Sequence, residues 1–117
     1  MSAPESAFPA LQALPWKATS WPGIRLSFLG QGAAAHRAVL IAMDPHCAYP
    51  RHRHLGDEEV FVLAGSYRDA AGEYRAGEFL LNPAGSIHAA VAGPDGALLL
   101  ARVPEGIETL EEAPDRG

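Results

Sequence analysis

The stretch PRHRHLGDEEVFVLAG, residues 50–65, decides the fold of this chain. Side chains alternate between the two faces of a strand, so His52 and His54 point the same way. Leu55-Gly56-Asp57 indicates a tight turn, and Glu58 then begins a second, apolar strand. A hairpin of this kind can bring two imidazoles and one carboxylate to one point, and these are groups that bind divalent metals.

A second stretch, GEFLLNPAGSIH (residues 77–88), adds a histidine after a strong turn signal. Together the two stretches resemble the paired motifs of the cupin superfamily. The matching positions are His52-x-His54-x3-Glu58-x6-Gly65 and Gly77-x5-Pro83-x-Gly85-x2-His88. The amino-acid sequences of both stretches are most similar to the cupin-like domain of ChrR-type anti-sigma factors and its free-standing relatives. This resemblance covers roughly residues 14–104.

The resemblance implies an all-β fold, a small antiparallel β-barrel of the jelly-roll or double-stranded β-helix type. It also implies one divalent metal ion, held by His52, His54, Glu58 and His88. Three imidazoles and one carboxylate suit a closed tetrahedral site for Zn and an octahedral site for Fe, Mn or Ni. The ligand types therefore leave the metal open.

Glu59 is the alternative carboxylate ligand, because the family also allows four intervening residues and a β-bulge can shift strand parity. By simple alternation Glu59 instead faces outward and pairs with Arg51 or Arg53. Taken alone, the His52-x-His54 pair would fit a polar surface strand equally well. The second motif at His88 is what favours metal binding.

Two positions depart from the cupin motifs, because His46 replaces the first glycine and Ala92 replaces the last asparagine. Histidine is one of the residues tolerated at positive φ, so we expect the turn at His46 to persist. His46 then either lines the pocket or lies on the surface. Cys47 is expected to be a small half-buried hydrophobe, with a redox or ligand role as the alternative, and His36 is expected to be structural.

Composition limits the classes of function. A chain of 117 residues predicts one domain, and a net charge of −5 argues against nucleic acid and anionic membrane surfaces as partners. One cysteine, Cys47, excludes an internal disulfide. No signal peptide is recognisable, and the longest apolar runs are too short to span a bilayer. We therefore expect a cytoplasmic protein.

Short strands separated by glycine and proline turns predict a barrel at residues 16–104. Residues 1–15 are expected to be an N-terminal arm, and residues 105–117 an acidic tail or short helix. Turns are predicted at Gly65 and at residues 93–96. The apolar interior is predicted to contain Val60, Val62, Leu81, Ile87, Leu98 and Leu100.

The resemblance leaves two functions open, each with a small molecule in the barrel. One is a metal-dependent, iron-type dioxygenase that cleaves small diketones or hydroxyketones. The other is a non-catalytic zinc-binding sensor related to the ChrR cupin domain. A homodimer is expected, because short barrels leave open strand edges and the N-terminal region has more apolar side chains than one barrel covers. These are Phe8, Leu11, Leu14, Trp16 and Trp21.

Overall fold

The computed structural model describes residues 11–30 and 38–111, which form one antiparallel β-sheet and a single 3-10 turn at Leu11–Ala13. His36 and Phe8 lie outside the described residues. The strands are β1 (Lys17–Ala18), β2 (Ile24–Leu29), β3 (Ala38–Met43), β4 (Ala48–His54), β5 (Glu58–Asp69), β6 (Gly72–Arg75), β7 (Phe79–Asn82), β8 (Ile87–Arg102) and β9 (Ile107–Thr109). No helix within the described residues is long and apolar enough to cross a membrane.

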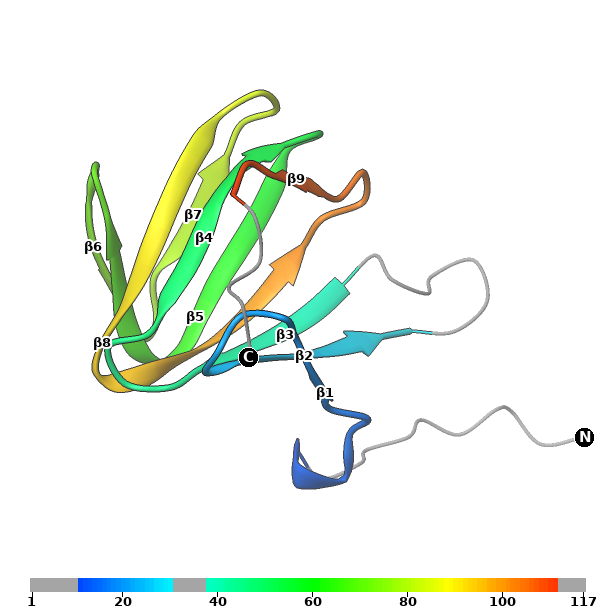
Figure 1. Cartoon of the computed structure of the whole chain (residues 1–117), viewed down its shortest axis with the longest axis vertical. Helices are drawn as coiled ribbons and strands as arrows, with labels where there is room; N and C mark the ends of the chain where they lie inside the picture. Colours follow the sequence, from blue (N-terminus) through cyan, green and yellow to red (C-terminus); the bar gives the residue numbers. More distant parts are fainter. Residues whose placement is uncertain (1–10, 31–37, 112–117) are drawn as a thin grey trace, which may run out of the picture.

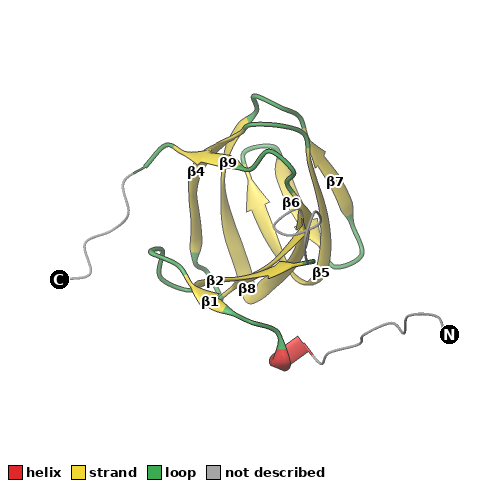
Figure 2. Ribbon diagram, turned by 90° about the vertical axis from the view of Figure 1, so that its right-hand side faces the viewer, coloured by secondary structure: helices red, strands yellow, loops and turns green. Residues whose placement is uncertain are grey.

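The long strand β8 organises the sheet. Its first half pairs with β4, its second half pairs with β3, and β5 runs along its other side. Figure 1 shows β8 turning sharply midway, so that the two groups of strands fold toward each other. Seen from the side, the strands enclose the interior of a small barrel (Figure 2). The predicted all-β antiparallel barrel is therefore confirmed.

The turns predicted at Gly65 and at residues 93–96 are wrong, because β5 and β8 each continue through these positions. The pairing of β5 with β8 shifts register on both sides of Gly65, which is typical of β-bulges. Gly65 and Gly96 have φ values of 69° and 76°, and a Cβ atom on Gly65 would lie 2.0 Å from the carbonyl oxygen of Gly96. Gly65 and Gly96 therefore let the paired strands β5 and β8 bend at the same place and continue, whereas a turn would have ended each strand there.

The interior of the barrel is only partly as predicted. Val60 and Val62 are buried, whereas Leu81 and Ile87 are 53% and 42% exposed. Between Ala97 and Ala101 of β8 the buried residues are Ala97, Leu99 and Ala101, and the predicted Leu98 and Leu100 are only half-buried. Residues 97–101 are apolar on both faces, so alternation alone does not show which face is inside.

The predicted tail or helix after Pro104 is also partly wrong. Residues Ile107–Thr109 form β9, which pairs with the end of β4. Acidic side chains hold this segment in place: Glu108 lies 2.7 Å from the Arg53 guanidinium, and Glu111 accepts a hydrogen bond from the backbone of Arg51. An apolar residue among these acids, Ile107, can then turn toward the interior.

Candidate metal centre

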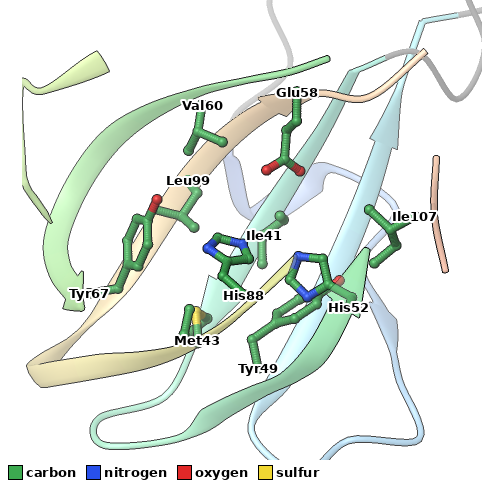
Figure 3. Close-up of a pocket in the computed structure, with 11 residues that line it drawn as sticks. Ile41, Met43, Tyr49, His52, Glu58, Val60, Tyr67, His88, Leu99 and Ile107 are labelled. Carbon is green, nitrogen blue, oxygen red and sulfur yellow. The ribbon is translucent and has the colours of Figure 1, made fainter. Parts of the chain in front are cut away.

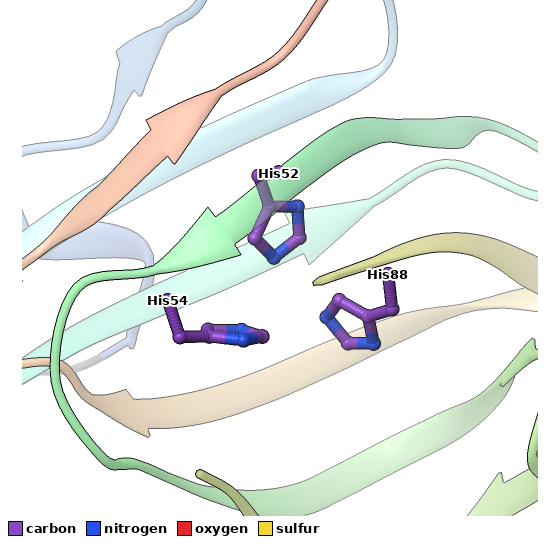
Figure 4. Close-up of side chains that lie close together, drawn as sticks. All are labelled: His52, His54 and His88. Atoms are coloured by element: carbon purple, nitrogen blue, oxygen red, sulfur yellow. The ribbon is translucent and has the colours of Figure 1, made fainter. Parts of the chain in front are cut away.

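Strand β4 carries two histidines into the interior. Burial alternates along the strand, so that His52 and His54 are buried while Arg51 and Arg53 are exposed. His88 on β8 is the direct cross-strand partner of His52. Figure 4 shows the imidazoles of His52, His54 and His88 converging on one space, and each offers a ring nitrogen within 4.8 Å of the others.

The outer nitrogen of each ring is held by an acceptor. Nδ1 of His52 lies 2.7 Å from the carbonyl oxygen of Pro50, and Nδ1 of His88 lies 2.9 Å from Oδ2 of Asp69. Nδ1 of His54 lies 3.1 Å from the carbonyl oxygen of Ser86. Carbonyl and carboxylate oxygens only accept, so each Nδ1 carries the hydrogen and each Nε2 presents its lone pair to the common space.

Glu58 begins β5 at the fourth side of this space. It is 7% exposed, and its Oε1 accepts a hydrogen bond from Nδ2 of Asn82 at 2.8 Å. Asn82 was missed in the sequence, although it lies inside the second motif.

A buried pair of acceptors marks the centre. Nε2 of His54 lies 3.1 Å from Oε1 of Glu58 and has no hydrogen-bond partner within the described residues. With its hydrogen on Nδ1, this imidazole and the carboxylate face each other with lone pairs alone. Such a contact is stable when a cation lies against both atoms. The donor set therefore fits a metal ion.

Glu59 does not join this group. It lies on the outer face, as alternation predicts, with Oε1 3.9 Å from the Arg102 guanidinium. The predicted partners Arg51 and Arg53 are wrong, because Arg102 of β8 is the direct cross-strand neighbour of Glu59. Arg53 pairs with Glu108 instead.

Asp69, at the end of β5, is a further residue of the site that the sequence did not reveal. Its Oδ2 lies beside Nδ1 of His88, while Oδ1 accepts hydrogen bonds from the backbone of Ala71 and Gly72 and from the Tyr74 hydroxyl. Burial acts to raise the pKa of Asp69, but these donors outweigh it and hold the pKa below its usual value. Among the three histidines, His88 alone therefore has a charged carboxylate, that of Asp69, beside its Nδ1.

An apolar cavity of about 40 Å³ opens beside the imidazoles. Figure 3 shows the Glu58 carboxylate pointing toward His52 and His88 across this cavity. Its walls are largely apolar, with two tyrosines; they include Ile41, Met43, Tyr49, Val60, Tyr67 and Leu99. Burial, with the nearby charge of Glu58, raises the pKa of Tyr49 to about 12, so its hydroxyl remains a hydrogen-bond donor at neutral pH.

The neighbours of the motif lie away from the centre. His46 is exposed and has φ of 62°, so it keeps the turn that the motif's glycine usually makes, and it is a surface residue. Cys47 is half-buried against the core, with Sγ 3.6 Å from the carbonyl oxygen of Gly23. Burial raises the pKa of its thiol, which fits the expected small hydrophobe.

Comparison with known families gives a match over most of the chain. A model of the ChrR cupin-like domain matches residues 5–103. No curated protein sequence matches this chain significantly.

Solved structures share the fold. A chain in the complex of Rhodobacter sphaeroides SigE with the anti-sigma ChrR is 27% identical, with a TM-score of 0.72, over 80% of this chain and 51% of that one. This chain thus spans about half the length of that relative. The polyketide cyclase RemF from Streptomyces resistomycificus is 19% identical with a TM-score of 0.72, over 95% of this chain and 89% of its own. An acetylacetone dioxygenase from Acinetobacter johnsonii is 12% identical with a TM-score of 0.74, over 100% of this chain and 85% of its own.

Proposed function

The chain belongs to the ChrR cupin-like domain family, and on that premise we propose that it is a metal-dependent, dioxygenase-like enzyme acting on a small carbonyl or diketone compound. In this proposal the side chains of His52, His54, Glu58 and His88 bind one divalent metal ion. The observation that carries this proposal is the contact of two buried acceptors, Nε2 of His54 and Oε1 of Glu58, at 3.1 Å.

The surroundings of the centre support a ligand-binding role over a purely structural one. His52, His88 and Glu58 form part of the wall of the apolar cavity, so an ion beside them is reachable by a small molecule. A bound Fe, Mn or Ni ion supplies Lewis acidity and redox chemistry with dioxygen, whereas Zn supplies Lewis acidity alone. The apolar walls exclude water, and the protonated Tyr49 hydroxyl can donate a hydrogen bond to a ligand oxygen.

Elemental analysis of freshly purified protein, followed by oxygen uptake with pentane-2,4-dione, tests the proposal. We expect about one equivalent of a redox-active metal and metal-dependent oxygen consumption. The matched control is the His52→Ala, His54→Ala, His88→Ala triple variant, which should lose both. Metal retention by this variant would show that the proposed ligands are wrong.

A zinc-binding sensor is the second candidate, favoured by the 27% identity to a chain in the SigE–ChrR complex. The same four ligands close around a tetrahedral ion, and a change of metal occupancy would alter the pairing of β4 with β8. Tightly bound zinc without oxygen uptake would favour this function over the enzyme.

We also propose a cytoplasmic homodimer, with residues 16–104 as the barrel and residues 1–15 as an arm that bridges two copies. Leu11 is 42% exposed at the described end of this arm, which supports an additional contact there. Deletion of residues 1–13 should shift the mass measured by light scattering toward monomer or aggregate, with little change in metal content per chain. A full-length protein that is monomeric at high concentration would contradict the dimer.

A further inference from the structure

A second, larger cleft adjoins the metal centre. It has a volume of about 430 Å³ and lies between the inner faces of β2 and β3 and the segment from Val103 to Ile107. Protein cavities that hold small molecules commonly have volumes of roughly 300–1,000 Å³. The cavity beside the imidazoles, at about 40 Å³, has room for only a few atoms. A ligand of ordinary size therefore needs the larger cleft as well.

The cleft and the smaller cavity share part of their walls. Ile41, Tyr49, Glu58 and Ile107 line both. Figure 3 shows Ile107 beside His52, at the side of the cavity away from Tyr67. One molecule can therefore lie in the cleft and extend a short end past Tyr49 to the space between Glu58 and the histidines.

The part of the cleft far from the histidines differs in polarity from the part that borders the small cavity. Leu26, Phe28 and Val39 make the cleft apolar at a distance from the histidines, whereas the Tyr49 hydroxyl and the Glu58 carboxylate lie at the shared boundary. Glu105 gives the cleft a second carboxylate, and the described residues that line it include no lysine or arginine. A metal ion bound by Glu58 would offset the charge of that carboxylate, so the Glu105 carboxylate is what disfavours a negative charge on the part of the ligand that lies in the cleft.

We propose that this cleft binds the apolar body of an uncharged small molecule, an aromatic ring or branched hydrocarbon, whose oxygen-bearing end reaches the metal centre. The inference rests on the proposed function and narrows its substrate class. An aryl-substituted diketone fits the two chambers, whereas pentane-2,4-dione leaves the cleft empty. Phe28, whose side chain lines the cleft and is 37% exposed, is the aromatic contact for the body of the ligand.

Binding of the uncharged fluorophore N-phenyl-1-naphthylamine tests the cleft directly. We expect saturable binding to the wild-type protein, weaker by about tenfold in Phe28→Ser, because roughly 50 Å² of apolar contact is lost. Val103→Ser, at a second wall of the cleft, should weaken binding in the same direction. The anionic 1-anilinonaphthalene-8-sulfonate should bind at least about tenfold more weakly than the neutral dye.

Phe79→Ser is the matched control, because Phe79 is 57% exposed and lies on the outer face of β7. It should leave dye binding unchanged. His52→Ala should lose metal but keep the dye, and Phe28→Ser should keep metal, so failure of the cleft and failure of the metal centre are distinguishable. Absent dye binding, equal binding of both dyes, or a loss in Phe79→Ser equal to that in Phe28→Ser would overturn the inference.

Discussion

Replacing Asp69 by asparagine should weaken metal binding while leaving the fold in place. Oδ2 of Asp69 accepts the Nδ1 hydrogen of His88 at 2.9 Å, and Oδ1 accepts the hydrogen bonds of the adjacent turn. In Asp69→Asn the amide oxygen can still accept the backbone hydrogen bonds of the turn, and the amide nitrogen then faces Nδ1 of His88. Two donors then meet, and the imidazole must move its hydrogen to Nε2, where it blocks the metal.

Loss of such an outer partner typically reduces metal affinity by about 10- to 100-fold. This range corresponds to roughly 1.4–2.8 kcal/mol of binding free energy. We expect the upper part of the range, because Asp69 is the carboxylate among the three outer partners and its side chain is only 6% exposed. Competition between the protein and a chromophoric chelator for Zn²⁺ or Co²⁺ near neutral pH measures the change.

Two controls separate this effect from damage to the hairpin. Tyr74→Phe removes one hydrogen bond to Oδ1 of Asp69 without touching His88. Asp57→Asn alters another carboxylate that accepts a backbone hydrogen bond, from Ala84. Both should change metal affinity by less than about twofold, within the usual range for surface substitutions. An Asp69→Asn affinity equal to wild type, or an equal loss in Tyr74→Phe, would refute the reasoning.

Three further predictions follow from the site. Glu58→Gln should lower metal affinity by at least about tenfold and Glu59→Gln by almost nothing, as measured by the same competition; the reverse order would show that Glu59 is the ligand. A chelator should lower the thermal midpoint by roughly 10 °C, since a ligand at 100 times its Kd adds about 2.7 kcal/mol; an unchanged midpoint would contradict the coupling of metal to fold. Burial raises the pKa of the Tyr67 phenol in the folded protein. The contribution of Tyr67 to the free energy of unfolding is therefore fully present below about pH 10, the usual pKa of tyrosine, and is lost as the pH rises toward the raised pKa. Alkaline denaturation of Tyr67→Phe should accordingly begin later than that of wild type, and identical curves would count against this.

The sequence was most informative where a feature depends on neighbouring residues. His52, His54 and Glu58 alternate within one hairpin, so strand periodicity alone placed them on one face. His88 required the second motif, because the pairing of His52 with His88 joins distant parts of the chain. The positive φ of His46 was also predictable, since it follows from the position of a missing glycine.

Other features depend on how distant strands meet, and these could not be predicted. Asp69 reaches His88 only because β5 and β8 bend together at Gly65 and Gly96. Leu98 and Leu99 are alike in polarity, so only the bend decides that Leu99 is inside. Ile107 follows Pro104, Glu105 and Gly106, which do not indicate a strand, and β9 forms there because it pairs with the end of β4.

The place of β8 in the sheet has a consequence for synthesis of the protein. This strand pairs with β3, β4 and β5, and it lies near the end of the described chain. A growing chain therefore holds β3, β4 and β5 without their main partner until β8 has left the ribosome. Pairing between strands so far apart in sequence is slow, and the exposed intermediate is prone to aggregation. His88 arrives with the same strand, so a metal bound by all three histidines would be loaded after translation of β8, as the sheet closes.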